Sequence, residues 1–237
     1  MILLFTVYAF AHKPSFGPNS SMNDAFVVED PNISIVVYQE MTCEDDQLWL
    51  GFYGEEGFEL YIQAGVPEVN RLEAYTPKVA VLAPGLPQVT VALPFEVPEG
   101  MGGVVYDSDE IPTPFYEPFT QTSSWVWVEE RLELPQTGEG FIVGWNEEEV
   151  TGKLWLATGE VEDFSDVGVS EFIVWNEYVN NFHETGRFEP VIPKEEISCI
   201  LAEDEGTAKN GCGGINALFI FPLMMTLRNR KKSTVHS

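Results

Sequence analysis

The stretch QLWLGFYGEEGFELYIQA, residues 47–64, decides the fold class of this chain. It contains two runs in which every second residue is apolar. These residues are Leu48, Leu50 and Phe52 in the first run, and Phe58, Leu60 and Ile62 in the second. A period of two is typical of a β-strand with one face in a core. The residues GEEG at 54–57 separate the runs, and a short Gly-containing turn at this place predicts a hairpin.

Other strand-like runs follow at short intervals along the chain. They span 33–38, 79–82, 88–93, 124–129, 140–146 and 152–158. The turn NEEEVTG between the last two predicts a second hairpin, and the Pro-rich stretch 94–122 predicts a long irregular crossover. No amphipathic helix interrupts the runs. We therefore expect a mainly β fold over 12–190, an antiparallel β-sandwich of jelly-roll-like form.

One amphipathic helix is expected at 165–185, where it closes the domain. Ser165 or Asp166 can cap its N-terminus, and Gly186 can end it. At 100° per residue, one stripe of this helix is apolar. It contains Phe172, Trp175, Val179 and Phe182. His183 falls inside the same stripe, so its side chain is expected to face the sheet rather than solvent.

Charge is the extreme feature of the composition. The chain has 38 acidic and 12 basic residues, a formal net charge of -26. Such a surface repels phosphate backbones, which argues against nucleic-acid binding. Two interpretations remain: a solvated surface that resists aggregation, or a surface that binds cations. The acidic runs 44–46 and 107–110 are short sets of oxygen ligands that can hold calcium, although neither matches an EF-hand loop.

The first eleven residues, MILLFTVYAFA, predict a signal peptide. They are wholly apolar, and Ala9 and Ala11 stand at the -3 and -1 positions of a signal-peptidase site. The usual basic region before the apolar stretch is missing, so either the true start lies upstream or the signal is atypical. The alternative is an N-terminal core strand. Cleavage after Ala11 would make His12 the first residue of the mature protein.

The C-terminal residues 212–237 predict a membrane anchor or sorting signal, preceded by a linker at 191–211. Cys212-Gly213-Gly214 is followed by the apolar run INALFIFPLMMTL and then by RNRKK. The basic cluster is expected to stay cytoplasmic, which places the preceding domain on the extracellular or periplasmic face. This layout resembles the C-terminal sorting signals of surface proteins of the CGP-CTERM and Synerg-CTERM kind. The resemblance implies a processing enzyme as partner and Cys212 as the anchor or cleavage residue; an uncut tail anchor is the alternative.

The three cysteines are Cys43, Cys199 and Cys212. Outside the cell an odd number suggests one disulfide and one Cys with another task. Cys43 and Cys199 are the natural pair, because Cys212 adjoins the apolar tail. Two free buried thiols are the alternative.

Two segments resemble the pre-peptidase C-terminal type of secreted β-sandwich domain. The first is the acidic entry, aromatic strand, Gly turn and apolar strand of residues 44–62. The second is LPQTG at 134–138, followed by FIV at 141–143 and TGKLWL at 151–156, which looks like the closing hairpin of that family. The resemblance implies a module that accompanies secreted enzymes or binds surfaces and is not itself a catalyst.

Only two histidines, His12 and His183, precede the C-terminal tail. If His12 becomes N-terminal, its amine and imidazole can chelate one metal, and the ring of His183 can complete a three-nitrogen set suited to copper. This arrangement resembles the histidine brace of copper-dependent polysaccharide monooxygenases. The alternatives are that His12 merely follows a cleavage site and that His183 is a core residue at a helix end.

Tryptophans in the later expected strands form either part of the core or a platform for sugar stacking. They are Trp125, Trp127, Trp145 and Trp155. In the run 124–129, Val126 and Val128 are expected together on the face opposite Trp125 and Trp127. No recognisable catalytic motif occurs. We therefore expect an exported, anchored β-sandwich with a ligand-binding or structural role and an envelope glycan or protein as partner. The alternative is a mononuclear copper protein, either a redox enzyme or a copper carrier.

Overall fold

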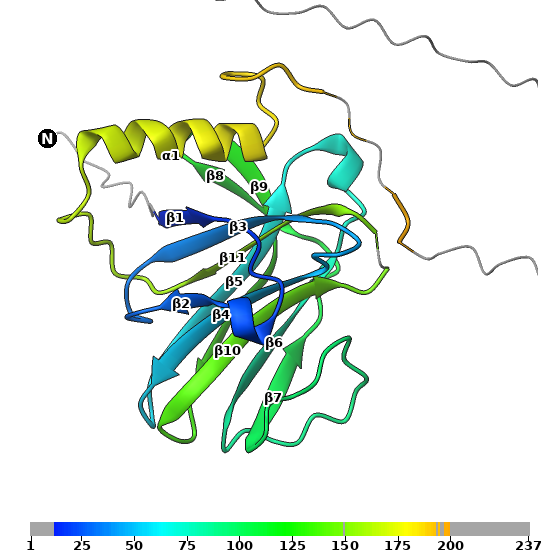
Figure 1. Ribbon diagram of the computed structural model, residues 1–237, viewed down its shortest axis with the longest axis vertical. Coiled ribbons are helices and arrows are strands. Elements are labelled where there is room, and N and C mark those ends of the chain that lie inside the picture. The colour runs from blue at the N-terminus through cyan, green and yellow to red at the C-terminus, as the bar shows by residue number, and fades with distance from the viewer. Residues whose placement is uncertain (1–11, 149, 193, 195–196, 200–237) are drawn as a thin grey trace, which may run out of the picture. The chain divides into compact units, whose positions relative to one another are not determined.

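The computed structural model describes residues 12–148, 150–192, 194 and 197–199, all within the compact unit Met1–Leu201. The expected signal peptide 1–11 and the expected anchor 212–237 lie outside the described residues. The chain is mainly β (Figure 1). Its strands are β1 Lys13–Phe16, β2 Phe26–Val28, β3 Ile35–Met41, β4 Gln47–Gly54, β5 Glu59–Pro67, β6 Pro77–Pro84, β7 Met101–Tyr106, β8 Thr113–Glu117, β9 Thr122–Glu133, β10 Gly138–Asn146 and β11 Gly152–Thr158. Its helices are α1 Val169–Phe182 and two 3-10 turns, η1 Met22–Asp24 and η2 Asn70–Leu72.

The strands form two sheets, and both are mixed rather than antiparallel. The six-stranded sheet has the order β1-β3-β11-β5-β9-β8, and the five-stranded sheet has the order β2-β4-β10-β6-β7. β1 pairs with β3 in parallel, and β2 pairs with β4 in parallel. The expectation of purely antiparallel sheets was therefore wrong. The two exceptions are short strands from the loop-rich N-terminal region, which extend the edge of each sheet by running alongside β3 and β4.

The two expected hairpins are instead crossings between the sheets. β4 pairs with β10 and β2, whereas β5 pairs with β9 and β11. The turn at 54–57 thus carries the chain from one sheet to the other, and the turn after β10 does the same. A Gly-containing turn between alternating runs indicates that the chain reverses direction. It does not indicate whether the two flanking strands hydrogen-bond to each other.

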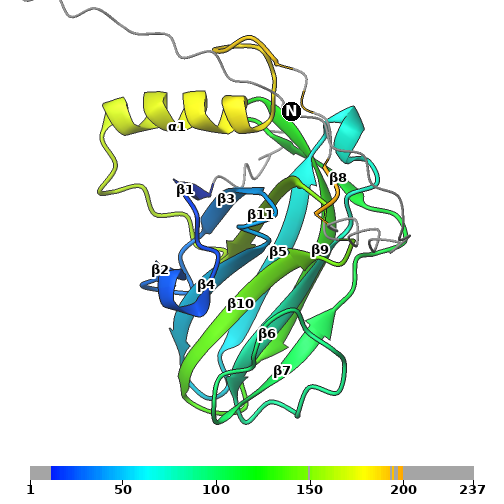
Figure 2. The same ribbon diagram turned by 45° about the vertical axis from the view of Figure 1, so that its right-hand side comes forward.

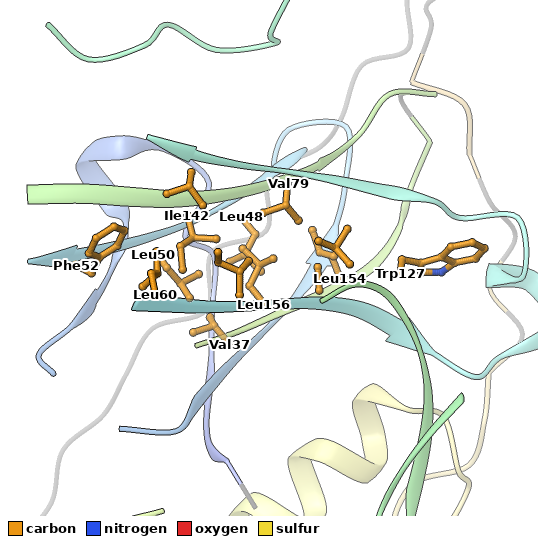
Figure 3. Packing of buried hydrophobic residues seen from close by; sticks show 14 of the residues in the cluster. Val37, Leu48, Leu50, Phe52, Leu60, Val79, Trp127, Ile142, Leu154 and Leu156 are labelled. Atoms are coloured by element: carbon orange, nitrogen blue, oxygen red, sulfur yellow. The ribbon is translucent and has the colours of Figure 1, made fainter. Parts of the chain in front are cut away.

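The main core lies between the two sheets (Figure 3). β4 contributes Leu48, Leu50 and Phe52, which the alternation placed on one face. β5 contributes Leu60 and Ile62 from the other sheet in the same way. The period-two pattern in 47–64 therefore correctly identified the inward faces of both strands.

A β-bulge in β9 breaks the expected alternation of residues 124–129. Ala64 of β5 pairs with Val128, and the next residue, Gly65, pairs with Val126, so that Trp127 is the extra residue. Val128 then joins the core between the sheets, whereas Val126 lies in a second cluster outside it. The expectation that Val126 and Val128 share a face was wrong, because an inserted residue reverses the side-chain direction from that point onward.

The outer face of the five-stranded sheet is covered by the segment 85–100. Phe95 of this segment contacts Trp49 and Trp145 edge-on, at centroid distances of 5.0 and 5.3 Å. The strand expected at 88–93 is absent from the described elements, because this stretch lies across a sheet face instead of along an edge. Conversely, the stretch 94–122 contains β7 and β8 and is not one irregular crossover.

Local sequence explains why β7 and β8 were missed. In β7, Gly102 is required because a Cβ atom there would lie 2.1 Å from the carbonyl oxygen of Leu86. The resulting Gly pair hides the alternation of the strand. In β8, Pro114 lacks an N–H donor, and this is tolerated because β8 is the edge strand of its sheet.

The helix α1 packs on the outer face of the six-stranded sheet. Figures 1 and 2 both place it beside β1 and β8. It is shorter than the expected 165–185, and its N-cap is Gly168, whose N–H donates to the carboxylate of Glu171 at 2.7 Å. The expected caps Ser165 and Asp166 lie before the helix starts. Among the described residues, no helix is long and apolar enough to cross a bilayer.

Candidate functional site

His183 is buried at the C-terminal end of α1, as its place in the apolar stripe predicted. Its side chain is 7% exposed. Nδ1 lies 2.8 Å from the carbonyl oxygen of Val179, so Nδ1 carries the hydrogen and donates it. Nε2 is then an acceptor, and the hydroxyl of Ser124 in β9 donates to it at 3.0 Å. The indole N–H of Trp155 in turn donates to the Ser124 oxygen at 3.2 Å.

His12 lies just before β1, at the edge of the six-stranded sheet. Its Nδ1 is hydrogen-bonded to the hydroxyl of Ser34, and the next residue, Lys13, donates its backbone N–H to the Ser34 carbonyl at 3.0 Å. Ser34 is itself buried. These contacts fix the direction of the chain where it enters the sheet, so the imidazole is held in a defined place.

The two histidines line one cavity between α1 and the outer face of the six-stranded sheet. We call it the histidine cavity; its volume of ≈ 30 Å³ is enough for one or two water molecules. Tyr38, Trp155 and Glu117 also line it. His12 and His183 are 171 positions apart in the sequence, so the fold alone brings them to one enclosure.

Burial sets the charge state of the groups in the histidine cavity. Loss of water contact lowers the pKa of both His12 and His183 to about 4, so both rings are neutral at physiological pH. The same loss raises the pKa of Glu117, whose carboxylate accepts the backbone N–H of Phe119 at 2.8 Å. Burial also raises the pKa of Tyr38 far above its usual value.

The histidine cavity fits a metal ion only in part. Neutral imidazoles are ligands for copper, and the bond from His183 Nδ1 to a carbonyl is the kind that orients a ligating histidine. However, Nδ1 of His12 and Nε2 of His183 are already bonded to Ser34 and Ser124. In the part of the chain that the structure describes, no three His, Cys, Asp or Glu side chains gather as a metal site.

Comparison with protein-family models and with curated proteins found no match for this chain.

A second and larger depression adjoins the histidine cavity, and sequence reasoning missed it. We call it the α1 cleft; its volume is ≈ 540 Å³. It lies between the C-terminal half of α1, the edge formed by β1 and β3, and the segment 186–194 that follows the helix. Tyr38 lines both spaces. The aromatic side chains of the cleft are Phe16, Tyr38, Tyr178 and Phe182, and its charged ones are Glu40, Asp45, Lys153, Glu184, Glu189 and Lys194.

Lys153 of β11 is the least expected residue of the α1 cleft, because its side chain is only 2% exposed. Its ammonium group donates to the carbonyl oxygen of Phe182, the last residue of α1, at 2.5 Å. It also lies 3.0 Å from the carboxylate of Glu184 and 3.6 Å from that of Glu40. Desolvation lowers the pKa of Lys153 despite the attraction of Glu184 and Glu40.

Glu184 links this ion pair to a second one. Arg71 in η2 donates to the same carboxylate oxygen that contacts Lys153. Glu184 has a positive φ of 53°, which marks the turn that ends the helix. Lys153 and Arg71 therefore hold the end of α1 and its following turn against the sheet, and this arrangement shapes one wall of the α1 cleft.

The aromatic wall of the cleft is a contiguous stack. The ring of Phe16 lies parallel to that of Tyr38 at a centroid distance of 5.3 Å, and it contacts Tyr178 at 5.2 Å. Tyr38 also meets Phe182 edge-on at 4.9 Å. Tyr178 remains 55% exposed, so the stack presents an open ring to solvent.

The candidate tryptophans form no aromatic platform, and of the two acidic runs Asp45 alone lines the α1 cleft. Trp127, Trp145 and Trp155 are buried, which assigns them to the core rather than to a sugar-stacking platform, and Trp125 is half-buried against it. In the acidic runs, Asp45 accepts a hydrogen bond from Ser20, and Asp107 pairs with Lys78.

Cys43 and Cys199 form a disulfide. Beside it, the backbone N–H of Thr151 donates to the carbonyl of Ile197 at 3.0 Å. Lys194 also pairs with Glu40 of β3 at 2.7 Å. The segment that follows α1 is thus fixed to the sheet at its far end, which holds the outer wall of the α1 cleft in place. Cys212 lies outside the described residues.

Proposed function

We propose that this chain is an exported β-sandwich protein of jelly-roll-like form, anchored at the cell envelope, that binds a ligand in the α1 cleft. The observation that carries the proposal is the cleft itself. Its volume of ≈ 540 Å³ lies within the range of ~300–1,000 Å³ for small-molecule sites. It combines an exposed aromatic stack with charged groups in fixed positions, which is the composition of a binding site.

The disulfide and the sequences of the two termini support the export and anchor parts of the proposal. A disulfide that joins residues 156 positions apart persists in oxidising compartments and is rare in the cytosol. The apolar N-terminal residues are typical of a signal peptide. The C-terminal residues, apolar and then basic, are typical of a membrane anchor or sorting signal. Cys212 is the proposed anchor residue, with Gly213 and Gly214 in the processing motif.

Ligand binding is tested by NMR on full-length protein in detergent micelles, labelled with fluorotyrosine. Tyr178 lines the cleft, and Tyr53 on β4 is its matched control, because the two side chains are 55% and 57% exposed and Tyr53 does not line the cleft. A diverse library of small polar and aromatic compounds, including monosaccharides, is added. We expect some compounds to move the Tyr178 resonance and leave Tyr53 unchanged. A library that never moves Tyr178 beyond Tyr53 would overturn ligand binding in the cleft.

Export and anchoring are tested on the native protein. Mass spectrometry of the intact chain reads both termini and any attached lipid in one measurement. We expect a mature N-terminus at His12 and a change of mass or processing at Cys212. A retained Met1, or a Cys212→Ala variant with the same membrane fraction and the same C-terminus as the wild type, would contradict the proposed labels.

A second candidate function is favoured by one specific observation. Because His12 and His183 line the same cavity, we also consider a mononuclear copper protein, a redox enzyme or copper carrier. The free amine and Nδ1 of a mature His12, with Nε2 of His183, would hold the ion, and Ser34 and Ser124 would release these nitrogens. The ion would supply one-electron chemistry.

The copper candidate is tested by adding Cu(II) to mature protein that begins at His12 and recording EPR spectra and calorimetry. Tight one-to-one binding with nitrogen hyperfine structure, lost in His183→Ala, would support it. Ser165→Ala, outside the cavity, is the control variant. Binding that is weak, or unchanged by His183→Ala, would end the copper candidate and leave the proposal for the α1 cleft intact.

A further inference from the structure

The α1 cleft is lined by more carboxylates than ammonium groups. Its lining contains four of them, on Glu40, Asp45, Glu184 and Glu189. The same lining contains two ammonium groups, on Lys153 and Lys194. The charge balance of the cleft is therefore negative before any ligand enters.

Both lysines of the cleft are already occupied by two of these carboxylates. Lys153 lies 3.0 Å from Glu184 and 3.6 Å from Glu40, and Lys194 lies 2.7 Å from Glu40. Arg71, which approaches from outside the cleft, adds a further partner for Glu184. Neither lysine is left to attract an anionic ligand.

The other two carboxylates have no cationic partner among the described residues. The carboxylate of Asp45 accepts a hydrogen bond from the hydroxyl of Ser20 at 2.6 Å and pairs with no described Lys or Arg. Glu189 is exposed beside Pro190 and likewise pairs with none. Both line the cleft: Asp45 lies in the connection that follows β3, and Glu189 lies in the segment that follows α1.

The aromatic stack adds a second kind of attraction. The rings of Phe16, Tyr38 and Tyr178 line the same space, and Tyr178 is the exposed member of the stack. Such rings attract ammonium and guanidinium groups at distances up to about 6 Å, and they also bury apolar ligand surface. One contact of this kind exists within the protein, because the ammonium nitrogen of Lys153 lies 5.0 Å from the centroid of the Phe182 ring.

We propose that the α1 cleft binds an organic cation, in which an ammonium or guanidinium group is attached to an apolar body. The cation lies near Asp45 and Glu189, and the apolar body lies against the aromatic stack. The inference rests on the proposed function of the cleft and names its ligand class. The formal net charge of -26 supports it, since a strongly negative surface raises the local concentration of cations and speeds their association.

Three probes that share one phenyl group separate this ligand class from the others. They are phenethylammonium, neutral 2-phenylethanol and anionic phenylacetate, each titrated into full-length protein while the Tyr178 resonance is followed. We expect phenethylammonium to bind about tenfold more tightly than 2-phenylethanol and phenylacetate to bind least. Raising the ionic strength should weaken the binding of phenethylammonium alone, because added salt screens its charge.

A double variant tests whether the carboxylates of Asp45 and Glu189 attract the cation. Asp45→Asn with Glu189→Gln removes two carboxylates from the cleft and should reduce phenethylammonium affinity about tenfold. Glu55→Gln with Glu56→Gln removes the same charge from the turn between β4 and β5, and it should leave the affinity within about twofold. Equal effects of the two double variants would mean that only the overall field attracts the cation, and they would overturn the assigned contacts.

The failures of the two proposals give different results. If 2-phenylethanol or phenylacetate moves Tyr178 at the same or a lower concentration than phenethylammonium, the cleft binds ligands but the cation class is wrong. If none of the three probes moves Tyr178, the cation class is also wrong, and the library experiment decides separately whether the cleft binds any ligand.

Discussion

Replacing Lys153 with Met removes a buried charge while keeping most of the apolar stem. Three interactions are lost: the bond to the Phe182 carbonyl at 2.5 Å, and the ion pairs with Glu184 at 3.0 Å and Glu40 at 3.6 Å. The first holds the end of α1, where a cation also opposes the negative end of the helix dipole. We expect the variant to loosen the end of α1 and the wall of the α1 cleft together.

The expected loss in the free energy of unfolding depends on the carboxylates that remain after the ammonium group is removed. A hydrogen bond to a charged group contributes about 1.5–3 kcal/mol, and breaking a buried ion pair by removing one partner costs about 3–5 kcal/mol. Glu184, whose side chain is 11% exposed, keeps Arg71, so the orphaned charge is only partly uncompensated. Recovery of the desolvation cost of the ammonium group offsets a further part. We therefore expect a loss of about 3 kcal/mol in the free energy of unfolding.

The assay is urea unfolding with the disulfide intact, followed by tryptophan fluorescence. Lys194→Met is the matched control, because Lys194 shares the partner Glu40 but its side chain is 49% exposed. Exposed pairs contribute about 0–1 kcal/mol, so this variant should change little. For a domain of this size, a loss of 3 kcal/mol corresponds to a decrease in Tm of about 6–12 °C.

Two results would refute the reasoning about Lys153. One is a loss below about 1 kcal/mol, or a loss equal to that of Lys194→Met. The other comes from adding Glu184→Gln to Lys153→Met. If the cost arises from the orphaned carboxylate, the double variant is more stable than the sum of the single losses predicts. Strict additivity would show that the two side chains do not act as a pair.

Two further predictions concern stability. Burial lowers the pKa of His183 to about 4 from its usual 6.5, so the unfolded state takes up a proton below pH 6.5 and the folded state does not. The stability contributed by the neutral ring is complete above pH 6.5 and is lost as the pH falls towards 4, by about 2 kcal/mol between pH 7.5 and 5. His183→Asn should remove this part of the pH dependence of the free energy of unfolding. An unchanged pH dependence would contradict the neutral buried ring. Gly159→Ala should cost about 3 kcal/mol in urea unfolding, because the positive φ of 75° is combined with a Cβ position 2.2 Å from the Ile33 carbonyl oxygen. Gly57→Ala, with a φ of 82° and open space around it, should cost only about 1 kcal/mol, and equal costs would show that the clash at Gly159 relaxes.

The inward faces of the strands could be predicted because burial acts on each strand separately. The alternation in 47–64 and the stripe of the helix each depend on neighbours a few positions away. The alternation identified the inward faces of β4 and β5, and the stripe identified Val179, Phe182 and His183 as buried, although Phe172 and Trp175 are only half-buried. The pairing of strands depends on long-range contacts, so the turn at 54–57 was mistaken for a hairpin. β1 and β2, with four and three residues, are too short to show any period.

The candidate site was only partly visible in the sequence for the same reason. The direction of His183 followed from helical spacing, but its enclosure with His12 depends on how β1 adds to the sheet. The α1 cleft is built from segments on β1, β3, β11 and the chain after α1. One local signal was overlooked: Lys153 interrupts GKLWLAT, a strand buried at every position, and a charge in such a strand must have a buried partner.

The disulfide has a mechanical consequence. Cys199 follows the last contacts of the segment after α1, and its covalent partner, Cys43, lies in the connection between β3 and β4. A pull on the chain beyond residue 199 is therefore transmitted through a sulfur–sulfur bond to the β3–β4 connection, and it bypasses α1. Once the bond is reduced, the load falls first on the contacts that fix the preceding segment to the sheet, Thr151 with Ile197 and Lys194 with Glu40, and then on the end of α1.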